Sequence, residues 1–221
     1  MTFQRARNEE QRESRRRAIL DTAAAMLDEM PLAEVSLNEL SRRVGLAKSN
    51  VLRYFESRED VLLELLDDFL GRWLTDLATE LAEGIDAQAT PDRRATELAD
   101  ILSRSLANRP VLCDLFGAQG GVLEHNVSVD AIKRHKRSSL GRLATMTELM
   151  RQHVPELGDN ARLFCLMSLL SAGALSAYAP PPPSLLAAYA DEPALGALHM
   201  ELRDALRASF TSTLLGVLPR A

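Results

Sequence analysis

The sequence predicts an all-α protein with a small N-terminal helix-turn-helix (homeodomain-like) domain and a larger C-terminal helical bundle. Three observations support this fold class. Apolar residues recur at helical spacing along most of the 221 residues, and no stretch combines strand-like alternation with β-branched enrichment. The composition, 46% hydrophobic and 26% charged, is typical of a globular chain with cores to bury.

The first two helices are defined by their ends. A helix over about residues 10–30 is expected to stop at Pro31, because proline cannot continue an interior turn. Ser36 can cap a second helix, and the carboxylate of Glu39, three residues later, can reach back to the cap amide. This second helix is expected to end near Gly45.

A third, short helix is predicted over about residues 47–55, followed by a long fourth helix. Ser57 and Asp60 repeat the capping spacing at the start of the fourth helix. Its apolar stripe is long enough to connect the N-terminal domain to the larger bundle. The stripe consists of Leu62, Leu65, Leu66, Phe69, Trp73, Leu77 and Leu81.

Five more helices are predicted in the rest of the chain. They begin at Pro91 and at Pro110, and then cover about residues 128–153, 159–179 and 194–217. The second of the five is expected to end at the pair Gly120 and Gly121. The four prolines at 180–183 predict an extended spacer.

Residues 36–60 have the spacing of a helix-turn-helix, whose second helix enters the major groove of DNA. Val51 and Phe55 are i,i+4 neighbours expected to face inward. The expected base contacts are Lys48, Ser49, Asn50, Leu52 and Arg53. The expected phosphate contacts are the helix starts at Ser36 and Ser57, with Lys48, Tyr54 and Arg58.

These residues carry a resemblance to a known family. The pattern comprises Leu37, Leu40, Ser41, Gly45, Leu46, Val51, Tyr54, Phe55, Arg58, Glu59, Asp60 and Val61. Over about residues 12–70 it resembles the DNA-binding domain of the TetR family of bacterial regulators. Leu52 stands where the family usually carries tyrosine, and Arg58 where lysine is common. A typical operator of the family is therefore not carried over to this sequence.

The resemblance implies a homodimeric, ligand-responsive regulator, expected to be a repressor, that binds a palindromic double-stranded DNA operator. Residues 1–58 would form the DNA-binding domain, and residues 59–221 would bind a small-molecule effector and dimerise. The expected pocket residues are Phe69, Trp73, Leu112, Phe116, Met146, Met150, Phe164 and Met167. The expected dimer residues are Ser168, Ala172, Gly173, Leu198, Leu202, Leu206 and Phe210.

Charge is distributed unevenly along the chain. The formal net charge is −5, with +2 on residues 1–58 and −7 on residues 59–221. Arginines are concentrated before the first helical stripe, namely Arg5, Arg7, Arg12, Arg15, Arg16 and Arg17. Two interpretations stay open for them, a contact with DNA phosphates and a solvated, frayed chain end.

Other functions find little support in the sequence. The spacings of His125, His135, His153 and Cys113 match no local metal-ligand pair, and Cys113 and Cys165 are far apart. The chain lacks the common nucleophile, zinc and nucleotide motifs, so neither an enzyme nor a cofactor is expected. No signal peptide or membrane span is predicted, and a cytoplasmic protein is expected. The alternative is an all-α interaction or scaffold protein whose helix-turn-helix is only structural; salt-dependent duplex binding would separate the two.

Overall fold

The computed structural model describes residues 2–218, and side chains from residue 9 onward. The side chains of Arg5 and Arg7 therefore lie outside the described residues. Within residues 2–218 every regular element is helical, which confirms the all-α fold class. The chain divides into two compact units. One contains the chain up to Phe69 together with Ala118–Arg137, and the other contains Leu70–Gly117 and Ser138–Ala221.

The first unit contains the predicted helix-turn-helix. Its elements are α1 (Thr2–Glu29), η1 (Leu32–Glu34), α2 (Leu37–Val44), α3 (Lys48–Val51), the first part of α4 (Arg58–Gly84), the π-helical turn η2 (Gln119–Leu123) and the first part of α7 (Val129–His153). Apolar side chains of α1, α2, α3 and α4 form its core. Ile19, Met26, Leu40, Val51 and Phe55 are each at most 2% exposed.

The second unit is a helical bundle. Besides the later parts of α4 and α7, it contains α5 (Pro91–Ala107), α6 (Pro110–Ala118), η3 (Pro155–Asn160), α8 (Ala161–Ser176), α9 (Pro183–Asp191), η4 (Pro193–Leu198) and α10 (Leu202–Val217). The helix α10 packs against both α5 and α8. The helices α6 and α8 cross closely, because a Cβ added at Gly117 would lie 2.7 Å from the carbonyl oxygen of Gly173.

Most predicted helix boundaries agree with the structure, but three regions differ. The helix α1 continues back to Thr2, beyond the expected start near residue 10. The helix α3 ends at Val51, and helical turns continue it to Phe55 through backbone hydrogen bonds from Tyr54 and Phe55 to the Val51 carbonyl. Such tighter turns are common at the ends of α-helices.

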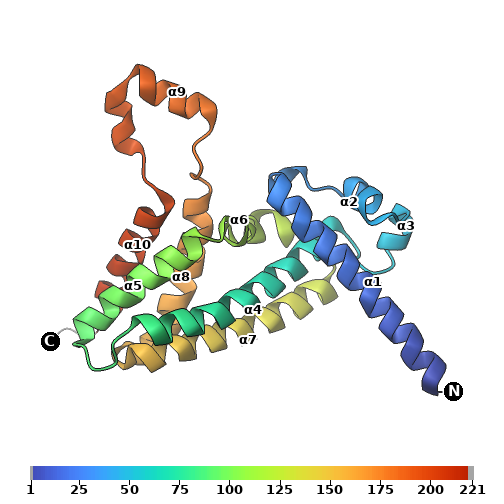
Figure 1. The fold of residues 1–221 in the computed structure, drawn as a ribbon, viewed down its shortest axis with the longest axis horizontal. Coiled ribbons are helices and arrows are strands. Elements are labelled where there is room, and N and C mark those ends of the chain that lie inside the picture. The colour runs from blue at the N-terminus through green and yellow to red at the C-terminus, as the bar shows by residue number, and fades with distance from the viewer. Residues whose placement is uncertain (1, 219–221) are drawn as a thin grey trace. The chain divides into compact units, whose positions relative to one another are not determined.

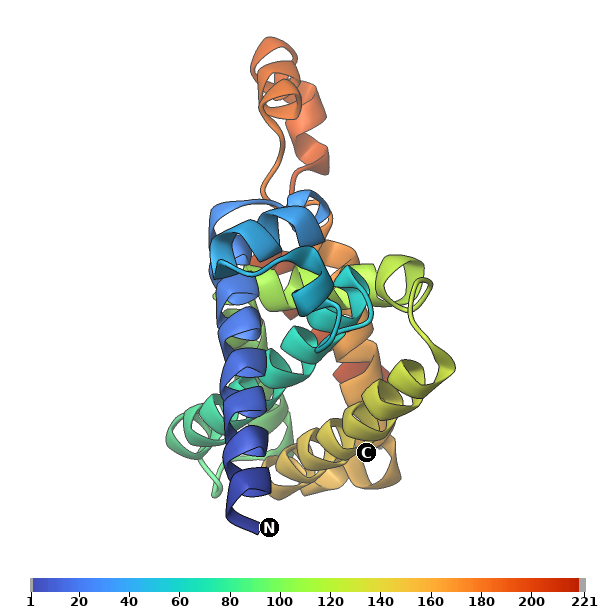
Figure 2. The same ribbon diagram turned by 90° about the vertical axis from the view of Figure 1, so that its right-hand side faces the viewer.

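The predicted helix over residues 194–217 is confirmed only for residues 202–217, and its first part is wrong. Residues 193–198 form the short 3-10 helix η4, and His199 is extended (φ −78°, ψ 134°) before α10 begins at Leu202. The helix α9 was not expected. Neither α9 nor η4 has a buried residue, so no packed core sustains one continuous helix through this region. The two elements pack on each other as an arm that projects from α8 and α10 (Figures 1 and 2).

Candidate nucleic-acid interface

Local hydrogen bonds fix both ends of α2. Ser36 is extended, and its Oγ accepts a hydrogen bond from the Glu39 amide at 3.2 Å, as the capping pattern predicts. Gly45 adopts φ +72°, a left-handed conformation that glycine reaches without a Cβ clash. The Leu46 amide then donates to the Ser41 carbonyl at 3.0 Å. This sharp turn sets the direction in which the chain enters α3.

The Glu39 carboxylate binds two arginines of α2, not the cap amide that we expected. Arg42 donates to it at 2.6 Å and Arg43 at 2.8 Å, and Arg43 also binds Glu29 at 2.6 Å. The hydrogen bond from Arg42, followed by that from Arg43, lowers the pKa of Glu39 to about 2. Both arginines of α2 are therefore paired with carboxylates.

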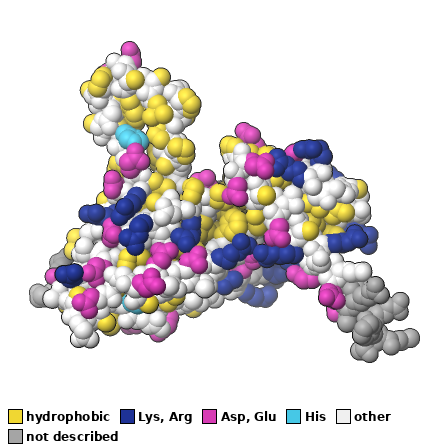
Figure 3. Space-filling view, in the orientation of Figure 1, with side chains coloured by type: hydrophobic (Ala, Val, Ile, Leu, Met, Phe, Trp, Pro, Cys, Tyr) yellow, Lys and Arg dark blue, Asp and Glu magenta, His cyan; other side chains and the backbone are white. Residues whose placement is uncertain are grey.

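The side chains of α3 and the turn after it separate into two faces. Val51 and Phe55 are at most 1% exposed and anchor the segment in the core. Leu52 is 42% exposed, and Tyr54 is half-buried. Five of the other predicted DNA contacts are exposed, namely Ser36, Lys48, Ser49, Asn50 and Arg53, whereas Ser57 and Arg58 are half-buried. At the α2 and α3 end of the first unit, Figure 3 shows blue lysine and arginine side chains beside yellow and white atoms.

Arg58 is positioned differently from the prediction. Its side chain is only 20% exposed, and its guanidinium binds the carbonyl oxygen of Leu32 in η1 and, at 3.2 Å, the carboxylate of Glu59. These bonds attach the start of α4 to the turn before α2. Arg58 thus has a structural role in this unit, and its contact with a DNA phosphate stays a prediction.

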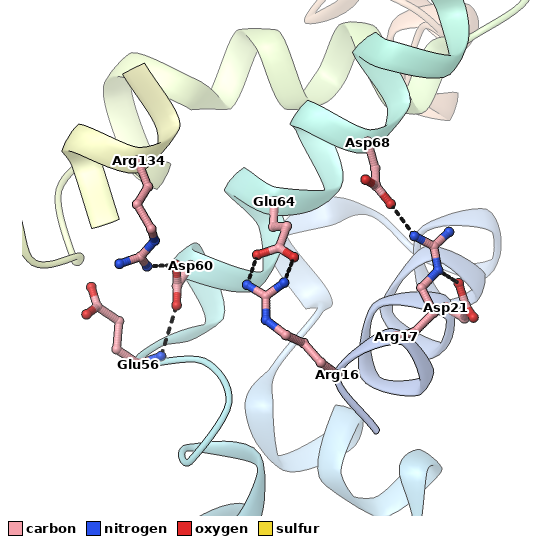
Figure 4. Close-up of polar contacts among 8 residues, drawn as sticks. All are labelled: Arg16, Arg17, Asp21, Glu56, Asp60, Glu64, Asp68 and Arg134. Atoms are coloured by element: carbon pink, nitrogen blue, oxygen red, sulfur yellow. Dashed lines mark hydrogen bonds and ion pairs between the residues drawn. The ribbon is translucent and has the colours of Figure 1, made fainter. Parts of the chain in front are cut away.

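Ion pairs join α1 to α4 within the first unit (Figure 4). Arg16 forms a two-pronged pair with Glu64, and its guanidinium carbon lies 4.8 Å from the centre of the Phe55 ring. Burial raises the pKa of Glu64 even though Arg16 opposes this effect. Arg17 binds Asp68 at 2.8 Å. Arg16 and Arg17 of α1 are therefore bound to carboxylates of α4.

The start of α7 belongs to the same unit, which local sequence patterns did not reveal. Asp60 accepts a hydrogen bond from the Glu56 amide at 3.1 Å and another from Arg134 of α7 at 3.3 Å (Figure 4). The Ser128 amide donates to the Glu56 carboxylate, and this bond lowers the pKa of Glu56. The contacts made by Arg134 and Ser128 join residues more than 70 positions apart, so no short motif could predict them.

The expected effector residues lie in the second unit, except Phe69, which is a half-buried residue of the first. Phe116 and Met167 are also half-buried. The others are at most 2% exposed: Trp73, Leu112, Met146, Met150 and Phe164. The indole N–H of Trp73 donates to the Ser105 hydroxyl at 3.0 Å, which fixes the ring between α4 and α5.

The expected dimer residues are distributed over three environments. Ser168, Ala172, Gly173, Leu206 and Phe210 are buried within the protomer. Leu202 is half-buried, and Leu198 is 79% exposed on the arm, separated from α10. Their role at a dimer interface stays a prediction. The exposed apolar face of α8 is formed instead by Leu163, Leu166 and Leu170, with exposures of 48%, 42% and 59%.

Within the described part of the chain, no three His, Cys, Asp or Glu side chains are grouped so that they could hold a metal ion. The same residues contain no helix that is both long enough and apolar enough to span a bilayer.

Comparisons with known proteins match almost the whole chain. Residues 19–65 match the family described as bacterial regulatory proteins, tetR family. Residues 67–221 match the tetracyclin repressor-like, C-terminal domain. The HTH-type transcriptional regulator EthR of Mycobacterium tuberculosis (strain ATCC 25618 / H37Rv) is 42% identical over 55 residues, which cover 25% of this chain and 26% of that protein. The similarity to this relative therefore spans about a quarter of each protein.

Two solved structures share the fold over nearly their full length. FadR of Thermus thermophilus, a TetR-family transcriptional repressor in complex with lauroyl-CoA, has a TM-score of 0.58 at 17% identity, covering 93% of this chain and 96% of that one. The fatty acid degradation regulator FadR of Bacillus halodurans has a TM-score of 0.53 at 15% identity, with coverages of 93% and 97%. At these identities the likeness concerns the fold.

Proposed function

Because this chain belongs to the TetR family of bacterial regulatory proteins, it is a DNA-binding transcriptional regulator, and we propose that it is a ligand-responsive repressor of a palindromic operator. The observation that carries the proposal is the separation of faces on α3. Val51 and Phe55 hold the segment in the core, while Lys48, Asn50 and Arg53 remain exposed. Arginine can bond guanine with two hydrogen bonds and asparagine can do the same with adenine, so this face can distinguish base pairs.

A selection of random duplexes on the purified protein tests the proposal. We expect one enriched motif with two inverted half-sites, because a symmetric dimer presents two identical reading heads. Affinity for the selected duplex should fall steeply with salt as condensed counterions are released. Absence of duplex binding at low salt would favour the alternative scaffold function.

For the effector we propose an apolar or amphipathic small molecule bound within the second unit. Methionine and aromatic side chains suit such ligands because they adapt their shape and offer polarizable surface. Met146, Met150 and Phe164 are buried in this unit. The structural neighbour from Thermus thermophilus is in complex with lauroyl-CoA, which makes that compound a reasonable first probe.

Trp73 provides the readout for effector binding. It is the chain's only tryptophan, and its indole is fixed by Ser105 inside the unit. Titration with lauroyl-CoA should change its fluorescence and release the labelled operator, whereas coenzyme A alone should do neither. By linkage, an effector that weakens DNA binding must itself bind more weakly to the DNA complex. An operator complex unaffected by lauroyl-CoA would exclude it as an effector.

We further propose that the exposed face of α8 forms the dimer contact. Leu163, Leu166 and Leu170 form an apolar surface that a second copy can cover. The double variant Leu166→Asp/Leu170→Asp should be monomeric in light scattering and retain wild-type helicity. Leu140→Asp, at a leucine of α7 that is 56% exposed, is the control and should remain dimeric. A wild-type monomer at micromolar concentration would refute dimerisation.

A further inference from the structure

An open cleft lies between the N-terminal half of α1 and the segment that contains α3. Its volume is about 440 Å³, and Gln11, Arg12, Arg15, Arg53 and Tyr54 line it. Three of the five lining residues carry a permanent positive charge, and none is a carboxylate. Tyr54 adds a hydroxyl group that can donate a hydrogen bond. The lining therefore consists of groups suited to binding a polyanion.

The arginines of this cleft differ from most of the other arginines described in the unit. Arg16, Arg17, Arg42, Arg43 and Arg58 bind carboxylates or a backbone carbonyl of the protein. Among the side chains described, in contrast, Arg12, Arg15 and Arg53 take part in no ion pair or hydrogen bond. These three guanidinium groups therefore keep their full donor capacity for an external partner.

Negative charge lies on one side of this site. A neighbouring cleft of about 470 Å³ shares Arg12 and Tyr54 with the first one. Its other lining residues are Glu9, Glu10, Glu13 and Arg16. A phosphate chain would be repelled from these carboxylates and directed toward Arg15 on the other side of the site.

The region of α1 that carries two of these arginines lies outside the family match. The match to the DNA-binding domain begins at residue 19, whereas α1 begins at Thr2. Figures 1 and 2 show that the N-terminal half of α1 extends beyond α2 and α3. Arg12 and Arg15 are thus additions to the matched domain, placed beside the Arg53 that belongs to it.

We propose that this cleft is a second DNA-contact site, in which Arg12 and Arg15 on the extension of α1 hold the phosphate backbone next to the bases read by α3. The proposal rests on the proposed function, because it assigns a further contact to the same DNA duplex. Phosphate contacts position a protein without reading bases. The extension should therefore increase affinity for every sequence and leave base preference unchanged.

The test compares the double variant Arg12→Ala/Arg15→Ala with a matched control, Lys133→Ala/Arg137→Ala. The control removes the same charge from two exposed residues of α7 in the same unit. Binding is measured by fluorescence anisotropy on the selected operator at several salt concentrations. Circular dichroism checks that both variants retain wild-type helicity.

Each phosphate contact contributes about 0.9 to the slope of log affinity against log salt. For each contact that it loses, we expect the double variant to bind the operator about fivefold more weakly at about 0.15 M salt. The slope of log affinity against log salt should become shallower by about 3 to 4 units for a dimer with two extensions. The selected base motif should stay the same, and the control should follow the wild type.

Two outcomes would separate failure of this inference from failure of the proposed function. If the wild type binds its operator and the double variant matches the control in affinity and salt slope, the second site is refuted and the regulator function stands. If the wild type binds no duplex at all, the proposed function itself fails. A changed base motif in the double variant would also overturn the assignment, because it would show direct base reading by α1.

Discussion

Replacing Gly45 by alanine should weaken the helix-turn-helix through backbone conformation alone. Gly45 has φ +72°, and a Cβ built on it meets no atom within 4 Å. The added methyl group therefore causes no clash with neighbouring residues. The remaining cost is that of holding an L-residue in the left-handed region, about 1–2 kcal/mol. The free energy of unfolding should fall by that amount.

Two further substitutions isolate this cause. Gly45→Asn should cost less than Gly45→Ala, because asparagine tolerates the left-handed conformation. Gly141→Ala, in the interior of α7, also places its Cβ in open space, but there the helix favours alanine. That change should stabilise the protein by about 0.5–1 kcal/mol. The same chemical substitution is thus expected to have opposite signs at the two glycines.

Chemical denaturation followed by circular dichroism measures these differences, and operator affinity is measured alongside. We expect Gly45→Ala to lower operator affinity as well, because the turn sets the direction of α3. Gly141→Ala should leave operator affinity unchanged. Equal unfolding free energies for Gly45→Ala and the wild type would refute the reasoning, since they would mean that the turn adopts a different conformation in solution.

Three other substitutions test separate features of the first unit. Phe55→Ala should lower the free energy of unfolding by about 3–5 kcal/mol in a denaturation experiment, because the ring is 1% exposed and leaves a cavity; a decrease below about 1 kcal/mol would contradict this burial. Arg53→Ala should relax base preference at one operator position at a cost of about 1–3 kcal/mol in a duplex selection, and an unchanged motif would argue against direct reading. Glu39→Gln tests a pH effect: the folded pKa of Glu39 is lowered from 4.5 to about 2, so its stabilising contribution is complete above 4.5 and disappears as pH falls toward 2. Acid titration of unfolding free energies should show the wild type and Glu39→Gln converging over that interval, and a constant difference would count against the ion pairs with Arg42 and Arg43.

Features determined within a few residues were predictable from the sequence. The cap at Ser36, the left-handed turn at Gly45, the stop before Pro31 and the helix start at Ser57 each depend on neighbours no more than four positions away. The inward positions of Val51 and Phe55 followed from helical spacing. Together these local rules were sufficient for the fold class and for the division of α3 into a buried and an exposed face.

Features that depend on competition between partners were not predictable. The capping pattern predicted that the Glu39 carboxylate would bind an amide, yet Arg42 and Arg43 on the next turn of α2 bind it instead. The position of Arg58 at a helix start predicted that it would bind a phosphate. In the structure its guanidinium donates a hydrogen bond to the Leu32 carbonyl. The partner of Arg58 depends on a tertiary distance that spacing along the chain does not specify, whereas Glu39 has two local arginines, three and four positions away, that compete with the amide.

Long-range assembly explains the remaining differences. The two compact units are not divided at residue 58, since Ala118–Arg137 groups with the first unit. Asp60 and Glu56 bind residues of that segment, Arg134 and Ser128. The functional boundary between residues 1–58 and 59–221 stays a prediction.

The helix α8 shows why the choice of a buried face could not be made from sequence. Apolar residues surround most of it, so hydrophobicity alone gives no preferred orientation. In the structure the small residue Gly173 faces α6, where even one added Cβ would lie 2.6 Å from the backbone nitrogen of Gly117. Close packing within the protomer therefore requires the small side of α8. The larger Leu163, Leu166 and Leu170 are left exposed. Burial of their apolar surface against a second copy would stabilise a dimer.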